Sequence, residues 1–197
     1  MGDDAALLDG EPVGPTTEVL PGRLVLVVGP SGAGKDTLIA AARARLEADP
    51  RFVFPRRIVT RPPSEAEDNV VADAEGFRAV AERGGFALAW QAHGHAYGIP
   101  ASIEADLARG ATVVVNVSRT VIAEARRRWP DVTVIEVSAD PAVLAARIAA
   151  RGRASDGASG DRLARRIDEV GEPDRRIDNG GELAAAVRAF LAAVTED

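Results

Sequence analysis

The sequence predicts an α/β protein in three layers, with a parallel sheet between two layers of helices. Short apolar segments rich in β-branched residues alternate with helical patterns along most of the chain, which is typical of a parallel sheet covered on both faces. The strongest apolar segment, residues 24–28, leads directly into a glycine-rich run at 29–34. With 197 residues, 46% of them hydrophobic, the chain is long enough for one domain with a sizeable core.

The elements follow in order from the N-terminus. Residues 1–21 are acidic, contain Gly and Pro and lack apolar periodicity, so we expect a flexible tail before a single domain at 22–197. The uninterrupted apolar run at 24–28 is typical of a strand buried on both faces. A helix should follow the glycines, because apolar residues recur there at helical spacing: Leu38, Ile39, Ala42 and Leu46.

The same alternation continues to the C-terminus. We expect further strands at residues 57–60, 86–90, 112–117 and 132–137. We expect further helices at residues 74–83, 100–109, 120–128, 141–150 and 182–194. For the helix at 100–109, Pro100 marks the start and Gly110 the end. Residues 151–160, rich in Gly, Ser and Ala, predict a loop, and a charged helix should follow to about residue 170.

Composition excludes several classes of protein. The chain has no cysteine, so it can form neither disulfides nor thiolate metal sites. A formal net charge of −6 argues against a general nucleic-acid-binding protein. No segment resembles a signal peptide and no apolar run reaches membrane-spanning length, so we expect a cytoplasmic protein without a membrane partner.

The glycine-rich run fits the phosphate-binding pattern G-x-x-x-x-G-K between a predicted strand and a predicted helix. Its glycines let successive backbone N–H groups point at a phosphate, and the helix N-terminus adds partial positive charge. We therefore expect ATP to bind at Gly29, Pro30, Ser31, Gly32, Ala33, Gly34, Lys35, Asp36 and Thr37. Lys35, the only lysine among 24 basic residues, is the predicted catalytic ammonium at the β- and γ-phosphates.

Asp36 departs from the usual pattern, in which a Ser or Thr after the lysine binds Mg²⁺ through its hydroxyl. Two interpretations are open. The carboxylate of Asp36 ligates Mg²⁺ directly or through water, or it caps the helix, a position that Asp favours.

The remaining basic residues indicate a kinase acting on a small phosphorylated acceptor. A GTPase needs a base-reading N-K-x-D motif, which a chain with one lysine cannot form, and a motor needs more residues. Arginines gather around the Gly/Ser segment at about 147–166, where we expect a lid that excludes water and supplies Arg151 and Arg153 to catalysis. A second basic cluster at the second predicted strand comprises Arg56, Arg57 and Arg61, with Arg61 at the carboxyl end of the strand. Arg57 and Arg61 are expected to bind the acceptor's phosphate.

Residues 90–100 hold both histidines and the only tyrosine of the chain. Amphipathic side chains in a glycine-containing segment suggest the wall of a ligand site, and the imidazole of His93 is suited to sugar hydroxyls. The alternative interpretation of the same residues is a surface hairpin with an aromatic anchor.

These motifs resemble guanylate kinase over nearly the whole chain from residue 22 onward. The resemblance rests on the G-P-S-G-A-G-K loop, Thr60-Arg61-Pro62 and the Y-G-x-P of residues 97–100. It implies a core sheet, a lid, and a small acceptor-binding subdomain at about 55–100. The positions that read guanine differ, however, and are Ser64, Asp73, Leu88, Asn116 and Ser118 in this chain. A leucine accepts no hydrogen bond from a guanine edge, so guanine specificity should be lost.

A closer resemblance is to the ribose 1,5-bisphosphate phosphokinases. It rests on Lys35-Asp36, Thr60-Arg61-Pro62, the segment 86–90, Tyr97-Gly98, and Asn116, Ser118 and Arg119. It implies transfer from ATP, with Mg²⁺, to α-D-ribose 1,5-bisphosphate in phosphonate breakdown, with His93, Tyr97, Asn116, Ser118 and Arg119 binding the sugar phosphate. The alternatives are a guanylate or other nucleoside-monophosphate kinase, and a non-catalytic guanylate-kinase-like module, which the intact loop disfavours.

Overall fold

The computed structural model describes residues 22–62, 68–150 and 172–196. A central sheet of five parallel strands has the order β2-β7-β1-β8-β9. Its strands are β1 (Leu24–Val28), β2 (Phe52–Val53), β7 (Thr112–Asn116), β8 (Val132–Ser138) and β9 (Arg175–Asp178). The middle strand β1 is buried along its full length, as its uninterrupted apolar run predicts.

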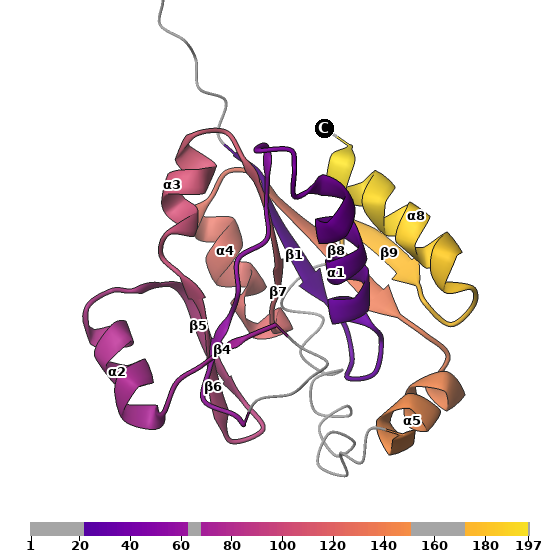
Figure 1. Ribbon diagram of the computed structural model, residues 1–197, viewed down its shortest axis with the longest axis horizontal. Helices are drawn as coiled ribbons and strands as arrows, with labels where there is room; N and C mark the ends of the chain where they lie inside the picture. Colours follow the sequence, from indigo (N-terminus) through magenta and orange to yellow (C-terminus); the bar gives the residue numbers. More distant parts are fainter. Residues whose placement is uncertain (1–21, 63–67, 151–171, 197) are drawn as a thin grey trace, which may run out of the picture.

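Helices cover both faces of this sheet (Figure 1). Alternate residues of β1 point to opposite faces, so that Val25 and Val27 join one core cluster and Leu24 and Leu26 join another. The first cluster packs under α1 (Lys35–Leu46) and α8 (Leu183–Thr195). The second packs under α3 (Ile103–Ala108), the 3₁₀ turn η1 (Arg119–Val121) and α4 (Ile122–Arg128). The predicted three-layer α/β architecture is therefore confirmed.

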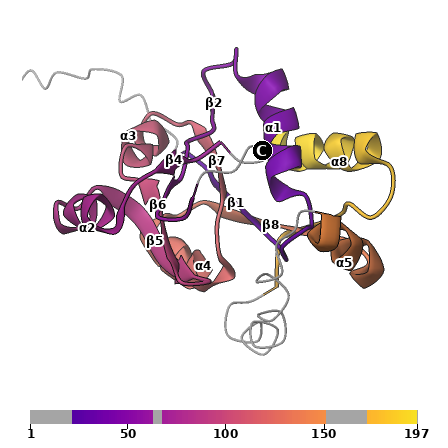
Figure 2. The same ribbon diagram turned by 60° about the horizontal axis from the view of Figure 1, so that its bottom comes forward.

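A second, smaller sheet lies beside the first, with strand order β4-β3-β6-β5 (Figure 2). It contains β3 (Ile58–Val59), β4 (Val70–Val71), β5 (Phe86–Ala92) and β6 (His95–Pro100), with α2 (Ala74–Glu82) beyond them. Strand β6 runs antiparallel to both β3 and β5. Leu88 of β5 and Ile99 of β6 belong to the same core cluster as Leu24, so the two sheets share one hydrophobic core.

In this region the structure agrees with one open interpretation and corrects one expectation. Strands β5 and β6 form a hairpin closed by His93 and Gly94, whose φ angles of 52° and 76° are those of a tight two-residue turn. The segment 90–100 thus has the hairpin conformation that was one of the two interpretations of its sequence. The helix expected from residue 100 begins at Ile103, because Pro100 still pairs with Phe86 at the end of β6.

The helix before the predicted lid is α5 (Pro141–Ala150). The N-terminal tail, the loop at 151–160 and the charged helix after it lie outside the described residues. Within the described part of the chain, no helix is long and apolar enough to cross a membrane.

Candidate functional site

The glycine-rich loop connects β1 to α1 and requires glycine for its path. Gly29, Gly32 and Gly34 have φ angles of 144°, 80° and 86°, a region that side chains with a Cβ rarely adopt. A Cβ at Gly29 would also collide with the carbonyl oxygen of Val137, and one at Gly34 with the side chain of Asn179. These glycines therefore fix the conformation that presents the backbone N–H groups to a phosphate.

Lys35 folds back over this loop. Its Nζ donates hydrogen bonds to the carbonyl oxygens of Gly29 at 2.8 Å and Pro30 at 3.0 Å. The structure thus holds the ammonium against the loop that is predicted to bind the β- and γ-phosphates.

Two residues from distant parts of the chain brace the loop. Asn179, which follows β9 and is 2% exposed, donates from Nδ2 to the carbonyl oxygen of Ala33 at 2.7 Å. Arg147 of α5 donates to the carbonyl oxygens of Asn179 at 2.9 Å and Gly32 at 3.4 Å. Arg147 belongs to the predicted arginine group near the lid, whereas no sequence motif singled out Asn179.

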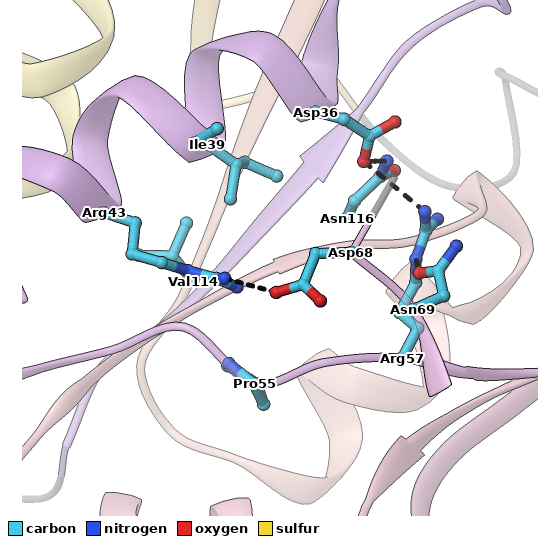
Figure 3. A pocket seen from close by; sticks show the side chains of 10 residues that line it. Asp36, Ile39, Arg43, Pro55, Arg57, Asp68, Asn69, Val114 and Asn116 are labelled. Atoms are coloured by element: carbon cyan, nitrogen blue, oxygen red, sulfur yellow. Dashed lines mark hydrogen bonds and ion pairs between the residues drawn. The ribbon is translucent and has the colours of Figure 1, made fainter. Parts of the chain in front are cut away.

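Asp36 lies in the first turn of α1, but its side chain does not cap the helix. The N-cap residue is Gly34, without a side-chain capping hydrogen bond. Instead, Oδ1 of Asp36 accepts a hydrogen bond from Nδ2 of Asn116 at 2.8 Å and forms an ion pair with Arg57 at 3.4 Å (Figure 3). The carboxylate is therefore turned toward the end of β7, while the neighbouring Thr37 is exposed.

Arg57 connects this carboxylate to the smaller sheet. It immediately precedes β3, its side chain is only 12% exposed, and its Nε donates to Oδ1 of Asn69 at 3.1 Å. Beside these groups lies a cavity of about 90 Å³ between α1 and the segments that lead into β3 and β4. Its lining includes Asp36, Arg57, Asn69 and Asn116 as well as apolar side chains.

The far end of the cavity holds a second cluster of charges. Nη1 of Arg43, on α1, lies 2.6 Å from Oδ2 of Asp68, and Nε of Arg56 lies 2.6 Å from Oδ1 of the same carboxylate. The hydrogen bond from Arg43, assisted by the positive charge of Arg56, holds the pKa of Asp68 below its ordinary value. The sequence indicated Arg56 as part of a basic cluster but not its partners, because Arg43 and Asp68 are 25 residues apart in the chain.

The other predicted acceptor residues occupy different places. Arg61 follows β3 and is half-buried. Tyr97 is buried and stacks on Trp90 with ring centroids 5.5 Å apart. His93 lies at the exposed tip of the β5–β6 hairpin. These three side chains are thus distributed along the smaller sheet rather than gathered at Asp36.

Of the three predicted site residues at the end of β7 and just after it, one lies at the cavity and two have local partners. Asn116 is buried and binds Asp36. Ser118 accepts hydrogen bonds from the backbone and hydroxyl of Thr120, which makes it the cap of η1. Arg119 forms an ion pair with Glu136 of β8.

Some expected site residues lie outside the described part of the chain, namely Arg151, Arg153 and Ser64. Leu88, at the position where guanylate kinases hold the base, is 1% exposed and packed in the core. The hydrophobic core has therefore taken over this position.

The described residues offer Mg²⁺ a single carboxylate rather than a cage. Within ranges 22–62, 68–150 and 172–196, no three His, Asp or Glu side chains are grouped so that they could hold a metal ion. Oxygen of Asp36 is a ligand of the kind that Mg²⁺ prefers, and Mg²⁺ in kinases is commonly held by one or two carboxylates, substrate phosphates and water. The donor set at Asp36 fits that mode of binding.

Comparison with known proteins finds no matching family model, but close relatives. A protein from Rhodopseudomonas palustris named ribose 1,5-bisphosphate phosphokinase PhnN is 52% identical over 177 residues, covering 89% of this chain and 90% of the relative. Proteins of the same name from Bradyrhizobium diazoefficiens and Methylobacterium radiotolerans are 48% and 56% identical, covering 92% and 74% of this chain and 90% and 83% of their own lengths.

The fold also occurs among solved structures. The crystal structure of guanylate kinase from Anaplasma phagocytophilum superposes with a TM-score of 0.66 at 17% sequence identity, covering 88% of this chain and 85% of that one. At this level of identity the similarity concerns the fold alone, and it confirms the predicted guanylate-kinase-like architecture.

Proposed function

Since this chain belongs to the ribose 1,5-bisphosphate phosphokinase family, we propose that it transfers the γ-phosphoryl group of ATP to the 1-phosphate of α-D-ribose 1,5-bisphosphate. The products are ADP and 5-phosphoribosyl 1-diphosphate, and the reaction serves phosphonate breakdown. The observation that carries this proposal is the identity of about half of all residues over most of both chains.

The donor side of the site is the loop from Gly29 to Lys35. Backbone N–H groups of the loop bind the β- and γ-phosphates of ATP, with the N-terminus of α1 adding partial positive charge. Lys35 Nζ exchanges its present carbonyl partners for phosphate oxygens and stabilises the charge that develops during transfer. Arg147 and Asn179 keep the loop in this conformation.

Asp36 is the residue that would hold Mg²⁺, alone or through water, with Asn116 orienting its carboxylate. When bound, the ion supplies charge neutralisation between the donor and acceptor phosphates. In many P-loop enzymes an acidic side chain at the end of a neighbouring strand supports the metal; here the strand β7 ends in a neutral amide, and the carboxylate is on α1.

The acceptor chemistry needs no general base. The attacking atom is an oxygen of the 1-phosphate, which is already anionic at neutral pH, so no proton has to be removed. The requirement is to bring two anionic phosphates together, which arginines accomplish by charge neutralisation and bidentate hydrogen bonds. Arg57, whose guanidinium faces Asp36 across 3.4 Å, is placed to contact the acceptor phosphate next to the donor site.

The buried state of Leu88 supports the sugar bisphosphate over GMP. A guanine base needs hydrogen-bond acceptors along its edge, and a site that lacks them loses that substrate by several orders of magnitude. Leu88 supplies only apolar surface and is enclosed in the core.

A parallel assay of four acceptors tests the proposal. ADP release from ATP is measured with ribose 1,5-bisphosphate, ribose 1-phosphate, ribose 5-phosphate and GMP at equal concentrations. We expect the highest kcat/KM with ribose 1,5-bisphosphate and essentially no turnover of GMP. Efficient turnover of GMP without turnover of the bisphosphate would contradict the proposed function.

A further inference from the structure

The cavity beside Asp36 has two charged ends, set apart along α1. Asp36 and Arg43 both line it and are seven residues apart in the same helix, which corresponds to about 10 Å along the helix axis. Asp36 immediately follows Lys35, so the reacting phosphate of an acceptor has to lie at this end. The ion pair of Arg43 with Asp68 lies at the other end (Figure 3), and Arg56 binds the same carboxylate.

Two guanidinium groups from separate elements converge on the carboxylate of Asp68. Arg43 comes from α1, Arg56 comes from the segment before β3, and each lies 2.6 Å from a different oxygen of Asp68. Arginine pairs bind phosphate oxygens with the same planar, bidentate geometry with which they bind a carboxylate. The carboxylate of Asp68 is thus held by two groups that are equally suited to a phosphate.

The backbone anchors the side chain of Arg43, and one of its hydrogen-bond donors has no partner among the described residues. Its Nη2 donates to the carbonyl oxygen of Phe54 at 3.1 Å, which anchors the side chain. Its Nε is buried and has no hydrogen-bond partner among the described residues, an arrangement that proteins usually avoid. The present pairing with Asp68 therefore leaves one donor of this guanidinium group unused.

Asp68, in contrast, holds these arginines from an exposed position. Its side chain is 52% exposed, and ion pairs with an exposed partner contribute little to stability because water competes for both charges. Releasing the carboxylate to solvent would leave both guanidinium groups directed at the same point. Arg43 lines the cavity, and Arg56 lies between two lining residues, Pro55 and Arg57.

We propose that Arg43 and Arg56 form a subsite for the second, non-reacting phosphate of the acceptor, and that Asp68 occupies this subsite until the phosphate displaces it. The inference rests on the proposed function and names its substrate class: a sugar with two phosphates, one at each end of the cavity. For ribose 1,5-bisphosphate the second phosphate is the 5-phosphate. Between the two ends, Asn69 and Asn116 offer amide groups to the sugar hydroxyls.

The first test compares acceptors with and without the second phosphate in Arg43→Gln. Loss of a charge-assisted contact to the 5-phosphate should lower kcat/KM for ribose 1,5-bisphosphate by about 10- to 100-fold. For ribose 1-phosphate, which lacks that group, we expect a change of less than about threefold, since the variant removes no contact to it. An equal loss with both acceptors would mean that Arg43 acts on the fold or on the reacting end, and would overturn the subsite.

The second test uses Asp68→Asn, for which the subsite predicts an effect of opposite sign. Removing the competing carboxylate should lower the KM for ribose 1,5-bisphosphate, whereas Arg43→Gln raises it. If Asp68 were only a structural latch between α1 and the segment before β4, both variants would raise the KM together, and this result would overturn the proposal.

Calorimetric titration with monophosphates gives a readout independent of turnover. Arg43→Gln should weaken binding of ribose 5-phosphate at least tenfold and leave binding of ribose 1-phosphate unchanged; equal weakening of both would contradict the subsite. Arg175→Gln is the matched control, because Arg175 forms a half-exposed ion pair with Glu196 at the far edge of the central sheet. This variant should bind both monophosphates as the wild type does.

The subsite and the proposed function can fail separately. If the wild-type protein does not use ribose 1,5-bisphosphate, the proposed function is contradicted as well. If the wild type uses it but Arg43→Gln affects both acceptors equally, only the subsite is contradicted.

Discussion

A few single residues perform most of the chemistry proposed for this site, and Lys35 is expected to contribute most to the rate of phosphoryl transfer. It is the only ammonium group among the side chains of the chain, and its Nζ already lies on the phosphate loop. A compact point charge can follow the transferring phosphate, whereas the wider fork of arginine cannot occupy the same space.

We predict that Lys35→Ala lowers kcat by roughly 10³-fold or more, because it removes electrostatic stabilisation of the transition state. The variant should still fold, since Lys35 contributes no apolar surface to the core clusters. Steady-state kinetics together with a thermal melt measure both quantities. A folded variant with near-normal kcat would refute the assigned role.

Asp36 is the second residue whose role can be isolated. Its carboxylate binds Asn116 and Arg57 rather than the helix backbone, so the capping interpretation has no support in the structure. We predict that Asp36→Asn raises the Mg²⁺ concentration for half-maximal rate by about tenfold or more, while Thr37→Ala changes it much less. Rates measured across a Mg²⁺ series decide this, and an unchanged profile in Asp36→Asn would exclude the metal-ligand role.

At the scale of elements, the conformation of the phosphate loop determines whether its backbone N–H groups can bind the phosphates of ATP. Gly34 combines a φ angle of 86° with close contact to the side chain of Asn179. We predict that Gly34→Ala destabilises the fold by about 1–3 kcal/mol through backbone strain and abolishes ATP binding.

Gly181→Ala is the control for this loop variant. Its added Cβ would meet no atom within 4 Å, and such surface changes usually alter stability by less than about 0.5 kcal/mol. Urea unfolding and calorimetric ATP titration should separate the two variants. Equal stability of both would show that the strain at Gly34 is absorbed elsewhere.

The elements also show what sequence patterns can and cannot predict. The strands at β1, β7 and β8 were predictable because their apolar runs are long enough to be buried on both faces. Strands β2 and β4 have two residues each, too few for any periodicity. Strand β9 reads Arg-Arg-Ile-Asp with only Ile177 buried, so its strand conformation comes from pairing with β8 rather than from its own composition.

The same limit applies to the site. The loop at 29–35 is a local motif and could be read from adjacent residues. The contacts of Asp36 with Asn116, of Arg43 with Asp68, and of Asn179 with Ala33 join residues 80, 25 and 146 positions apart. Only the folded chain brings these partners together, so the sequence could propose Asp36 and Asn116 as site residues without predicting that they touch.

At the scale of the whole molecule, the two sheets have to keep a fixed relation for donor and acceptor sites to face each other. Arg128 of α4 ties them together. It donates to the carbonyl oxygen of Ala87 in β5, pairs with Glu104 of α3 at 2.7 Å, and covers the ring of Trp129 at 4.5 Å.

We predict that Arg128→Ala lowers the free energy of unfolding by about 1–3 kcal/mol, since the buried carbonyl of β5 loses a charged donor, and raises the KM of the acceptor more than that of ATP. Arg127→Ala is the control, because this neighbouring side chain is exposed and forms no hydrogen bond or ion pair within the described residues. Chemical denaturation and two-substrate kinetics measure both effects; identical behaviour of the two variants would mean that Arg128 does not link the sheets.

The central claim, that one phosphate of a sugar bisphosphate is the acceptor, is tested most directly by ³¹P NMR of the product. After incubation of the protein with ATP, Mg²⁺ and α-D-ribose 1,5-bisphosphate, the account predicts loss of the 1-phosphate monoester signal. A coupled pair of diphosphate signals should replace it, with the 5-phosphate monoester retained. An unchanged bisphosphate spectrum, together with conversion of GMP to GDP under the same conditions, would contradict the account.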